Sequence, residues 1–257
     1  EARSALTLSA VNSINWARLM AQVVYYFYAA VRLGAPERPV AFSVPTGNFG
    51  DVFAGYVAAQ MGLPIARLVV ATNVNDILHR ALTSGDYSAG TVTPTATPSM
   101  DIQVSSNFER LLFDLSGRDG AAIAGMMTEF DRNRAMTLPA DMRAGAQALF
   151  SSARIDADGM TLALRWAQER GGQIIDPHSA VGLAAARALE IDGDVPVVTL
   201  ATAHPAKFRD AVERATGVRP ALPPRLGNLF EREERYSKLP GDYDAVKAHI
   251  LAEAARG

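Results

Sequence analysis

The sequence lacks cysteine altogether in its 257 residues, which excludes disulfides, thiolate metal sites and cysteine nucleophiles. Its four histidines lie far apart and show none of the short spacings typical of a metal site, so no metal is expected. No apolar run approaches the length that a membrane-spanning helix needs. The formal net charge is -2, and no basic stripe suggests nucleic acid or a membrane surface as a partner. We therefore expect a soluble, cytoplasmic protein that acts on a small molecule.

Hydrophobic residues make up 49% of the chain, which is enough for one large core. In the first half, the apolar spacing predicts a helix over 13–33 and another over 52–61. Short apolar runs at 39–44 and 66–71 are typical of buried strands, and a third helix follows residue 76. This alternation predicts an α/β fold, with an open and mostly parallel sheet and helices on both faces.

The second half continues the pattern less regularly. Residues 83–106 are rich in Ser, Thr, Pro and Gly, and we expect a long surface excursion there. Asn107 is expected to cap a helix that runs to Leu115. Further short helices are predicted within 119–149, at 161–170, at 180–190 and at 244–255; strands are predicted at 151–155 (an edge strand), 173–175 and 196–201.

Four polar loops directly follow predicted strands: 45–51, 72–76, 176–179 and 202–204. Ligands of open α/β sheets bind at the carboxyl ends of the strands, so these loops are expected to converge on one site. Within them, Asn73, Asn75 and Asp76 could line the site or cap the third helix, and Asp176-Pro177 is typical of a turn.

The loop from Thr46 to Gly50 joins a strand to a helix and contains the sequence GNFG. Glycines allow backbone amides to turn toward a ligand, and the helix amino terminus adds a partial positive charge. The GxxxxGK[ST] pattern of NTPases is absent, and the next strand ends without the acidic residue that binds the ribose of NAD. The loop therefore favours a compact phosphate monoester, although a simple strand–helix turn is the other interpretation.

Five segments, in the same order and over nearly the whole chain, resemble threonine synthases of the longer bacterial and fungal type. They are VNSINWAR (11–18), VPTGNFGD (44–51), ATNVND (71–76), DPHSAVG (176–182) and ATAHPAKF (201–208). The resemblance implies a pyridoxal-phosphate (PLP) enzyme with the tryptophan-synthase-β-like architecture, called fold type II. It also implies the conversion of O-phospho-L-homoserine and water to L-threonine and phosphate.

If the resemblance holds, Gly47, Asn48, Phe49 and Gly50 hold the phosphate of PLP, and Thr202 faces its pyridine nitrogen. A neutral hydroxyl just past a buried strand suits an unprotonated ring nitrogen. Capping of a following helix is the competing role for Thr202.

Asn12, Ser13, Asn15 and Arg18 are the corresponding candidates for binding the substrate phosphate. Asn15 and Arg18 are three residues apart, so they are expected to share one helix face. Arg18 is the only charged residue in an apolar stretch. Its planar guanidinium group could donate two hydrogen bonds to the oxygens of a phosphate. A structural ion pair with an acid elsewhere explains Arg18 equally well.

The resemblance also implies a lysine that binds PLP covalently, in a Phe-Lys-Asp-like segment well before the phosphate loop. None of Lys207, Lys238 and Lys247 has that context. We therefore expect residues 1–257 to be the carboxy-terminal part of a PLP enzyme, mainly its large cofactor-phosphate domain. The amino-terminal domain and the lysine segment are expected to be absent, so that this chain holds no catalytic residue and is inactive alone.

Three other interpretations are open at the level of sequence. The first is a sibling PLP lyase or dehydratase that shares the fold. The second is a non-catalytic domain that binds phosphate or a phosphorylated metabolite. An NAD oxidoreductase is the third, and the missing acidic residue disfavours it.

Overall fold

The structure of the chain is a computed structural model that describes residues 12–255. The chain divides into two compact units. The larger unit spans Asn12–Ala221, and the smaller one is described from residue 222 to residue 255. None of the described helices is both long and apolar enough to cross a membrane.

The core of the larger unit is a four-stranded sheet in which every pair of neighbouring strands is parallel. Its order is β5-β2-β1-β6, with β1 at Val40–Pro45, β2 at Ile65–Thr72, β5 at Phe150–Arg154 and β6 at Val197–Thr199. The predicted parallel sheet is thus confirmed. β5 lies at one edge of the sheet, as the sequence predicted.

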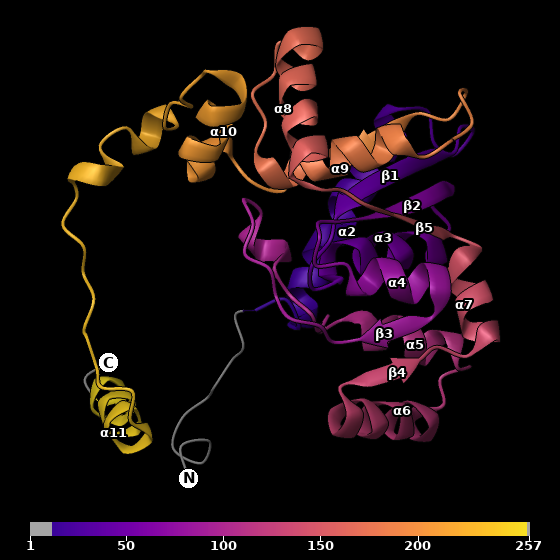
Figure 1. The fold of residues 1–257 in the computed structure, drawn as a ribbon, viewed down its shortest axis with the longest axis horizontal. Helices are drawn as coiled ribbons and strands as arrows, with labels where there is room; N and C mark the ends of the chain where they lie inside the picture. Colours follow the sequence, from indigo (N-terminus) through magenta and orange to yellow (C-terminus); the bar gives the residue numbers. More distant parts are fainter. Residues whose placement is uncertain (1–11, 256–257) are drawn as a thin grey trace. The chain divides into compact units, whose positions relative to one another are not determined.

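Helices cover both faces of this sheet (Figure 1). On one face lie α3 (Gly50–Gln60) and α4 (Ile77–Ser84), and α2 (Trp16–Arg32) packs against α3. On the other face α9 (Pro177–Ala188) contacts all four strands, with α8 (Ala157–Gly171) behind it. The predicted α/β fold with helices on both faces is therefore confirmed.

The remaining elements surround this sheet or lie beyond it in the chain. In the larger unit they are β3 (Asp86–Ser88) and β4 (Ala135–Thr137), which pair antiparallel, η1 (Pro98–Met100), α5 (Phe108–Leu115), α6 (Gly120–Asn133), α7 (Ala140–Gln147), η2 (Pro205–Phe208) and α10 (Arg209–Thr216). The smaller unit contains η3 (Pro224–Leu226), η4 (Leu229–Glu231) and α11 (Tyr243–Ala254).

Successive residues of β2 alternate between two apolar clusters, because side chains of a strand point to opposite faces. Leu68 and Val70 belong to the cluster under α3 and α4, whereas Val69 and Ala71 belong to the cluster under α8 and α9. Burial on both faces explains why this strand is a continuous apolar run in the sequence.

Helix α2 buries only one face. Leu19, Tyr26 and Ala30 are buried, as the helical periodicity requires. Other apolar side chains of the predicted pattern are exposed instead, including Met20 and Val24. The apolar spacing thus predicted the helix correctly but did not distinguish its buried face from its exposed one.

Two segments differ from the prediction. Residues 83–106 are only partly a surface excursion: residues 90–94 are exposed, but Tyr87, Thr97, Met100 and Ser105 are buried. Residues 173–175 form no strand. The first error has a tertiary cause: the polar side chains of this segment satisfy one another and distant partners, which lets a Ser- and Thr-rich segment pack inside the unit.

Candidate functional site

The loop from Gly47 to Gly50 presents unpaired backbone amides at the carboxyl end of β1. Two carbonyls of the loop accept hydrogen bonds from distant residues. The carbonyl of Gly47 accepts from the Ser105 hydroxyl at 2.9 Å. The carbonyl of Asn48 accepts from the backbone N–H of Asn107 at 3.1 Å and from its side-chain amide at 2.9 Å. Among residues 12–255, no atom accepts a hydrogen bond from the four backbone N–H groups of the loop. Three of these groups directly precede α3 and the fourth, that of Gly50, belongs to its first residue, so the helix dipole adds positive potential there.

Asn107 therefore does not play the role predicted for it. It precedes α5, but its side chain makes no capping hydrogen bond to that helix. Instead its amide donates to the carbonyls of Asn48 and Ser13 (3.1 Å to Ser13). The residue fixes the loop rather than the helix.

Phe49 adopts a left-handed conformation with φ of 61°, a region that non-glycine residues rarely occupy. Its ring is fully buried and packs against Phe108 and Phe150, with ring centroids 5.3 and 5.6 Å apart. This packing holds the strained turn. Only the backbone of Phe49 is available to a ligand.

Steric crowding requires glycine at position 47, whereas the sequence suggested that the geometry of the turn required it. A Cβ built there would lie 2.4 Å from the carbonyl oxygen of Ser99, which is far inside van der Waals contact. The backbone of η1 (Pro98–Met100) therefore lies directly against the loop. Any side chain at position 47 must displace one of the two backbones.

The loop lines a cavity of about 200 Å³ together with residues from four other parts of the larger unit. This volume is below the roughly 300–1,000 Å³ of complete small-molecule pockets, so the residues form one wall of a ligand site. The lining residues are Ser13, Arg18, Gln22, Pro45, Thr46, Gly47, Asn48, Phe49, Gly50, Asp51, Ser99, Met100, His178, Thr202, Ala203 and Lys207.

Two of the four candidates for the substrate phosphate line this cavity. Ser13 and Arg18 are there, but Asn12 and Asn15 are not. The amide oxygens of the two asparagines accept backbone N–H groups at the start of α2: Ile14 donates to Asn12 at 3.1 Å, and Ala17 donates to Asn15 at 2.9 Å. Asn15 caps the helix, so it does not share a helix face with Arg18 as predicted.

Arg18 lines the cavity and is exposed, although the stretch around it in the sequence is apolar. In the described part of the chain, no carboxylate lies within 4.0 Å of its guanidinium. The structural ion pair is therefore disfavoured as the reason for this arginine.

Thr202 lies in the same cavity as the loop, although the two are more than 150 residues apart in sequence. Its N–H donates to the hydroxyl of Ser179 at 3.2 Å. The alternative role as a helix cap is wrong, because His204 occupies that position and accepts from the N–H of Ala206. The side chain of Thr202 is exposed to the cavity and available to a ligand.

His178 reaches the cavity from the first turn of α9. Its Nε2 accepts from the Ser99 N–H at 3.3 Å, so the proton lies on Nδ1, which donates to Asp176 at 2.9 Å. Burial alone would raise the pKa of Asp176, but hydrogen bonds from His178 and Ser179 lower it below its ordinary value. Asp176 caps α9, so the predicted turn is a helix start.

Asp51 is a site residue that the sequence did not reveal. Its carboxylate accepts from the hydroxyls of Tyr25 and Tyr26, and the latter oxygen lies 3.2 Å away. Burial raises the pKa of Asp51 above 3.8, and the two tyrosine hydrogen bonds only partly oppose this effect. An acidic residue in the first turn of a helix usually suggests simple dipole stabilisation, so the sequence carried no distinct signal.

Asn73 and Asn75 neither line the cavity nor cap α4. Both are buried and donate to Asp101, at 2.7 and 3.1 Å. Asp76 precedes α4 and instead pairs with Arg80 at 2.9 Å. The asparagines thus anchor the segment that carries Ser99 to the cavity.

Known proteins resemble this chain closely. The family described as threonine synthase, C-terminal, matches residues 179–250. Threonine synthase of Pseudomonas aeruginosa is 51% identical over 251 residues, which cover 97% of this chain and 54% of that protein. The chain belongs to the threonine synthase family. It spans about half the length of the curated relatives that it matches.

Solved threonine synthases also share its fold. A PLP-bound threonine synthase from Brucella melitensis matches with a TM-score of 0.93 at 50% identity, covering 98% of this chain and 54% of that one. The yeast threonine synthase matches with a TM-score of 0.89 at 37% identity, covering 97% and 54%. The predicted family and the predicted fold are thus confirmed.

In this threonine synthase family member, Lys207 lies at the cavity that contains the loop and Thr202. Its side chain is exposed, and the ammonium lies 5.7 Å from the ring centroid of Phe208. Lys238 and Lys247 belong to the smaller unit. Lys207 was not among the site residues predicted from the sequence, because its segment does not resemble a covalent PLP site.

Proposed function

We propose that this chain forms the phosphate-binding wall of the PLP site in a threonine synthase. The whole enzyme would convert O-phospho-L-homoserine and water to L-threonine and phosphate. Membership of the family supports this proposal, as does the PLP-bound relative from Brucella melitensis. The proposal includes the cytoplasmic location expected from the sequence.

The observation that carries the proposal is the set of unpaired N–H groups from Gly47 to Gly50, which lie in one cavity with Thr202. Four amides at the start of α3 fit a phosphate dianion without any lysine. The hydroxyl of Thr202 suits the far end of the pyridine ring. PLP, when bound, supplies an electron sink for the substrate.

Ser13 and Arg18 are our proposed ligands for the substrate phosphate. They line the cavity beside the loop, and Arg18 presents its guanidinium without a carboxylate partner among the described residues. A guanidinium fork matches two phosphate oxygens. Since Asn12 and Asn15 hold backbone N–H groups instead, we assign them to the local structure of the α2 start.

The other interpretations differ in the ligand they require. A non-catalytic phosphate module uses the amide loop but has no need for Thr202 or Arg18. A dehydratase that acts on a substrate without phosphate again leaves Arg18 without a role, whereas a phospho-lyase-like sibling would differ from a threonine synthase in the product that it forms. The joint placement of Arg18, Thr202 and the loop therefore favours threonine synthase.

The test is an assay of the whole enzyme that contains this chain. We expect O-phospho-L-homoserine to yield L-threonine and phosphate in equal amounts, with no 2-oxobutyrate formed from L-threonine. Arg18→Gln should raise the KM for the phosphorylated substrate about tenfold or more, since charged hydrogen bonds contribute about 1.5–3 kcal/mol. Arg32→Gln is the control, because Arg32 lies on the same helix outside the cavity. An unchanged KM in Arg18→Gln would contradict the assignment.

A further inference from the structure

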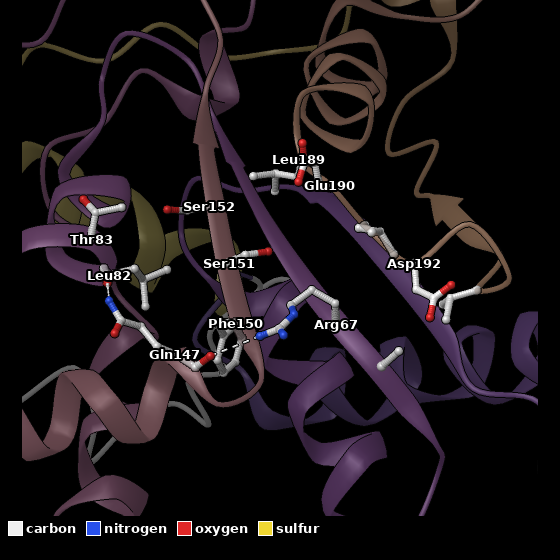
Figure 2. A pocket seen from close by; sticks show the side chains of 13 residues that line it. Arg67, Leu82, Thr83, Gln147, Phe150, Ser151, Ser152, Leu189, Glu190 and Asp192 are labelled. Carbon is white, nitrogen blue, oxygen red and sulfur yellow. Dashed lines mark hydrogen bonds between the residues drawn. The ribbon is translucent and has the colours of Figure 1, made fainter.

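A second cavity, of about 550 Å³, lies beside β2 and the edge strand β5, lined by other residues than the first. Its volume falls within the range of about 300–1,000 Å³ typical of small-molecule sites. The lining includes Arg67 of β2, Phe150 and Ser151 of β5, and the segment from Leu189 to Val195 (Figure 2).

One hydroxyl in the cavity has no hydrogen-bond partner among the described residues. It is the buried Oγ atom of Ser151, whereas the hydroxyl of the neighbouring Ser152 lies 2.9 Å from Nδ1 of His79. Figure 2 shows the two serines pointing to opposite sides of β5, with Ser151 on the side of Leu189. Leaving a buried hydroxyl unpaired is unfavourable, so such a group points to a missing partner.

The charged groups of this cavity are also incompletely paired. Nη1 of Arg67 donates to the carbonyls of Gln147 and Ala148 at 3.1 and 3.4 Å, whereas Nε and Nη2 donate to no acceptor within residues 12–255. Glu190 and Asp192 line the same cavity, and over residues 12–255 neither lies within 4.0 Å of a basic group. Opposite charges thus line one cavity without pairing.

We infer that this cavity binds a small α-amino acid. The carboxylate would bind Arg67 and the hydroxyl of Ser151, since a guanidinium fork matches a carboxylate. The ammonium would face Glu190 and Asp192 on the other wall. The apolar side chains of Leu189 and Ile191, which line the same cavity, would contact a short aliphatic side chain. This site is separate from the proposed PLP site.

Three probes with the same four-carbon skeleton test the inference: L-2-aminobutyrate, butyrate and n-butylamine. Titration of the chain by calorimetry, with backbone NMR to locate the shifts, should show binding of L-2-aminobutyrate. Butyrate and n-butylamine each lack one charge and should bind at least about tenfold more weakly, which corresponds to about 1.4 kcal/mol. The NMR shifts should centre on Arg67, Ser151 and the 189–195 segment.

Two variants make the result specific. Ser151→Ala removes only the unpaired hydroxyl, so it should fold as the wild type and bind L-2-aminobutyrate several-fold more weakly. Arg67→Gln should remove the preference for a carboxylate. Arg165→Gln is the control, because Arg165 also donates to a backbone carbonyl, that of Ala215, but lies outside this cavity. No binding of L-2-aminobutyrate to the wild type, or equal binding to Arg67→Gln, would overturn the inference. PLP titration reports on the other site and separates the two proposals.

Discussion

Asp51 places a carboxyl group next to a loop that we propose to bind a phosphate. Two anions side by side repel each other, so this position would be unfavourable for an ionised aspartate. Burial favours the neutral acid, and Tyr25 and Tyr26 hold it in place. The raised pKa of Asp51 is therefore compatible with a phosphate at the loop.

The raised pKa also predicts a pH dependence of stability. The folded state binds the Asp51 proton more tightly than the unfolded state, so the free energy of unfolding should fall as pH rises from 3.8 to the folded-state pKa. Each unit of pKa difference contributes about 1.4 kcal/mol. Asp51→Asn keeps an acceptor for both tyrosines but cannot ionise, so urea denaturation should show a flatter slope. A slope equal to that of the wild type would contradict the prediction.

Single residues differ in how far the sequence predicts them. Gly47 and Thr202 were expected at one site, and the structure places both at one cavity. Asn15 was assigned through the family resemblance and Asn107 through its position before a predicted helix, and the side-chain amides of both bond to backbone groups instead. The left-handed turn at Phe49 depends on its ring packing against Phe108, a contact between segments distant in sequence, so the turn could not be predicted locally.

At the scale of elements, the first turn of α9 holds two segments that line the cavity in place. Asp176 is completely buried and accepts from the backbone of His178 and Ser179, from the His178 ring and from the Ser179 hydroxyl. The Ser179 hydroxyl in turn accepts from the N–H of Thr202. One carboxylate thus connects the helix start, His178 and the β6 loop.

Asp176→Ala should therefore destabilise the protein more than loss of an ordinary helix cap. Removal of a cap costs about 1 kcal/mol, and the buried donors left unpaired should bring the total to about 3 kcal/mol. Asp119→Ala is the matched control, because Asp119 caps α6 at an exposed position through two backbone N–H groups. Urea denaturation of both variants measures the difference, and equal losses would show that the buried network contributes nothing.

Elements with strong periodicity were predicted well, and segments that depend on tertiary contacts were not. β1, β2 and the helices that follow them were expected within a few residues of their observed bounds. Residues 83–106 have the composition of a loop, but Thr95 and Thr97 bond to Asn73 in the interior. Such a network requires partners about twenty residues away, which hydrophobic periodicity does not detect.

At the scale of the whole molecule, the chain spans about half the length of the relatives that it matches. We propose that the lysine that binds PLP covalently lies outside this chain. Lys207 lines the cavity and is exposed. Its segment lacks the Phe-Lys-Asp-like context that the resemblance implies for the covalent lysine.

The chain alone should therefore hold PLP without a covalent bond and should form no L-threonine. We expect borohydride reduction at equimolar PLP, followed by peptide mapping, to leave Lys207 unmodified. Lys207→Gln should bind PLP about as well as the wild type in the same experiment. A pyridoxyl group on Lys207 would instead identify this residue as the covalent site.

The most direct test of the phosphate-binding loop is a titration of the chain with PLP and with inorganic phosphate, followed by ³¹P NMR. We expect one PLP per chain, bound more tightly than phosphate and displaced by phosphate in excess. Gly47→Ala should weaken PLP at least about tenfold, equivalent to 1.4 kcal/mol, because its Cβ would lie 2.4 Å from Ser99 O. Gly125→Ala, at a position with no neighbour within 4 Å of the added Cβ, should bind normally. Equal affinity for PLP and phosphate, or unchanged binding in Gly47→Ala, would contradict the account.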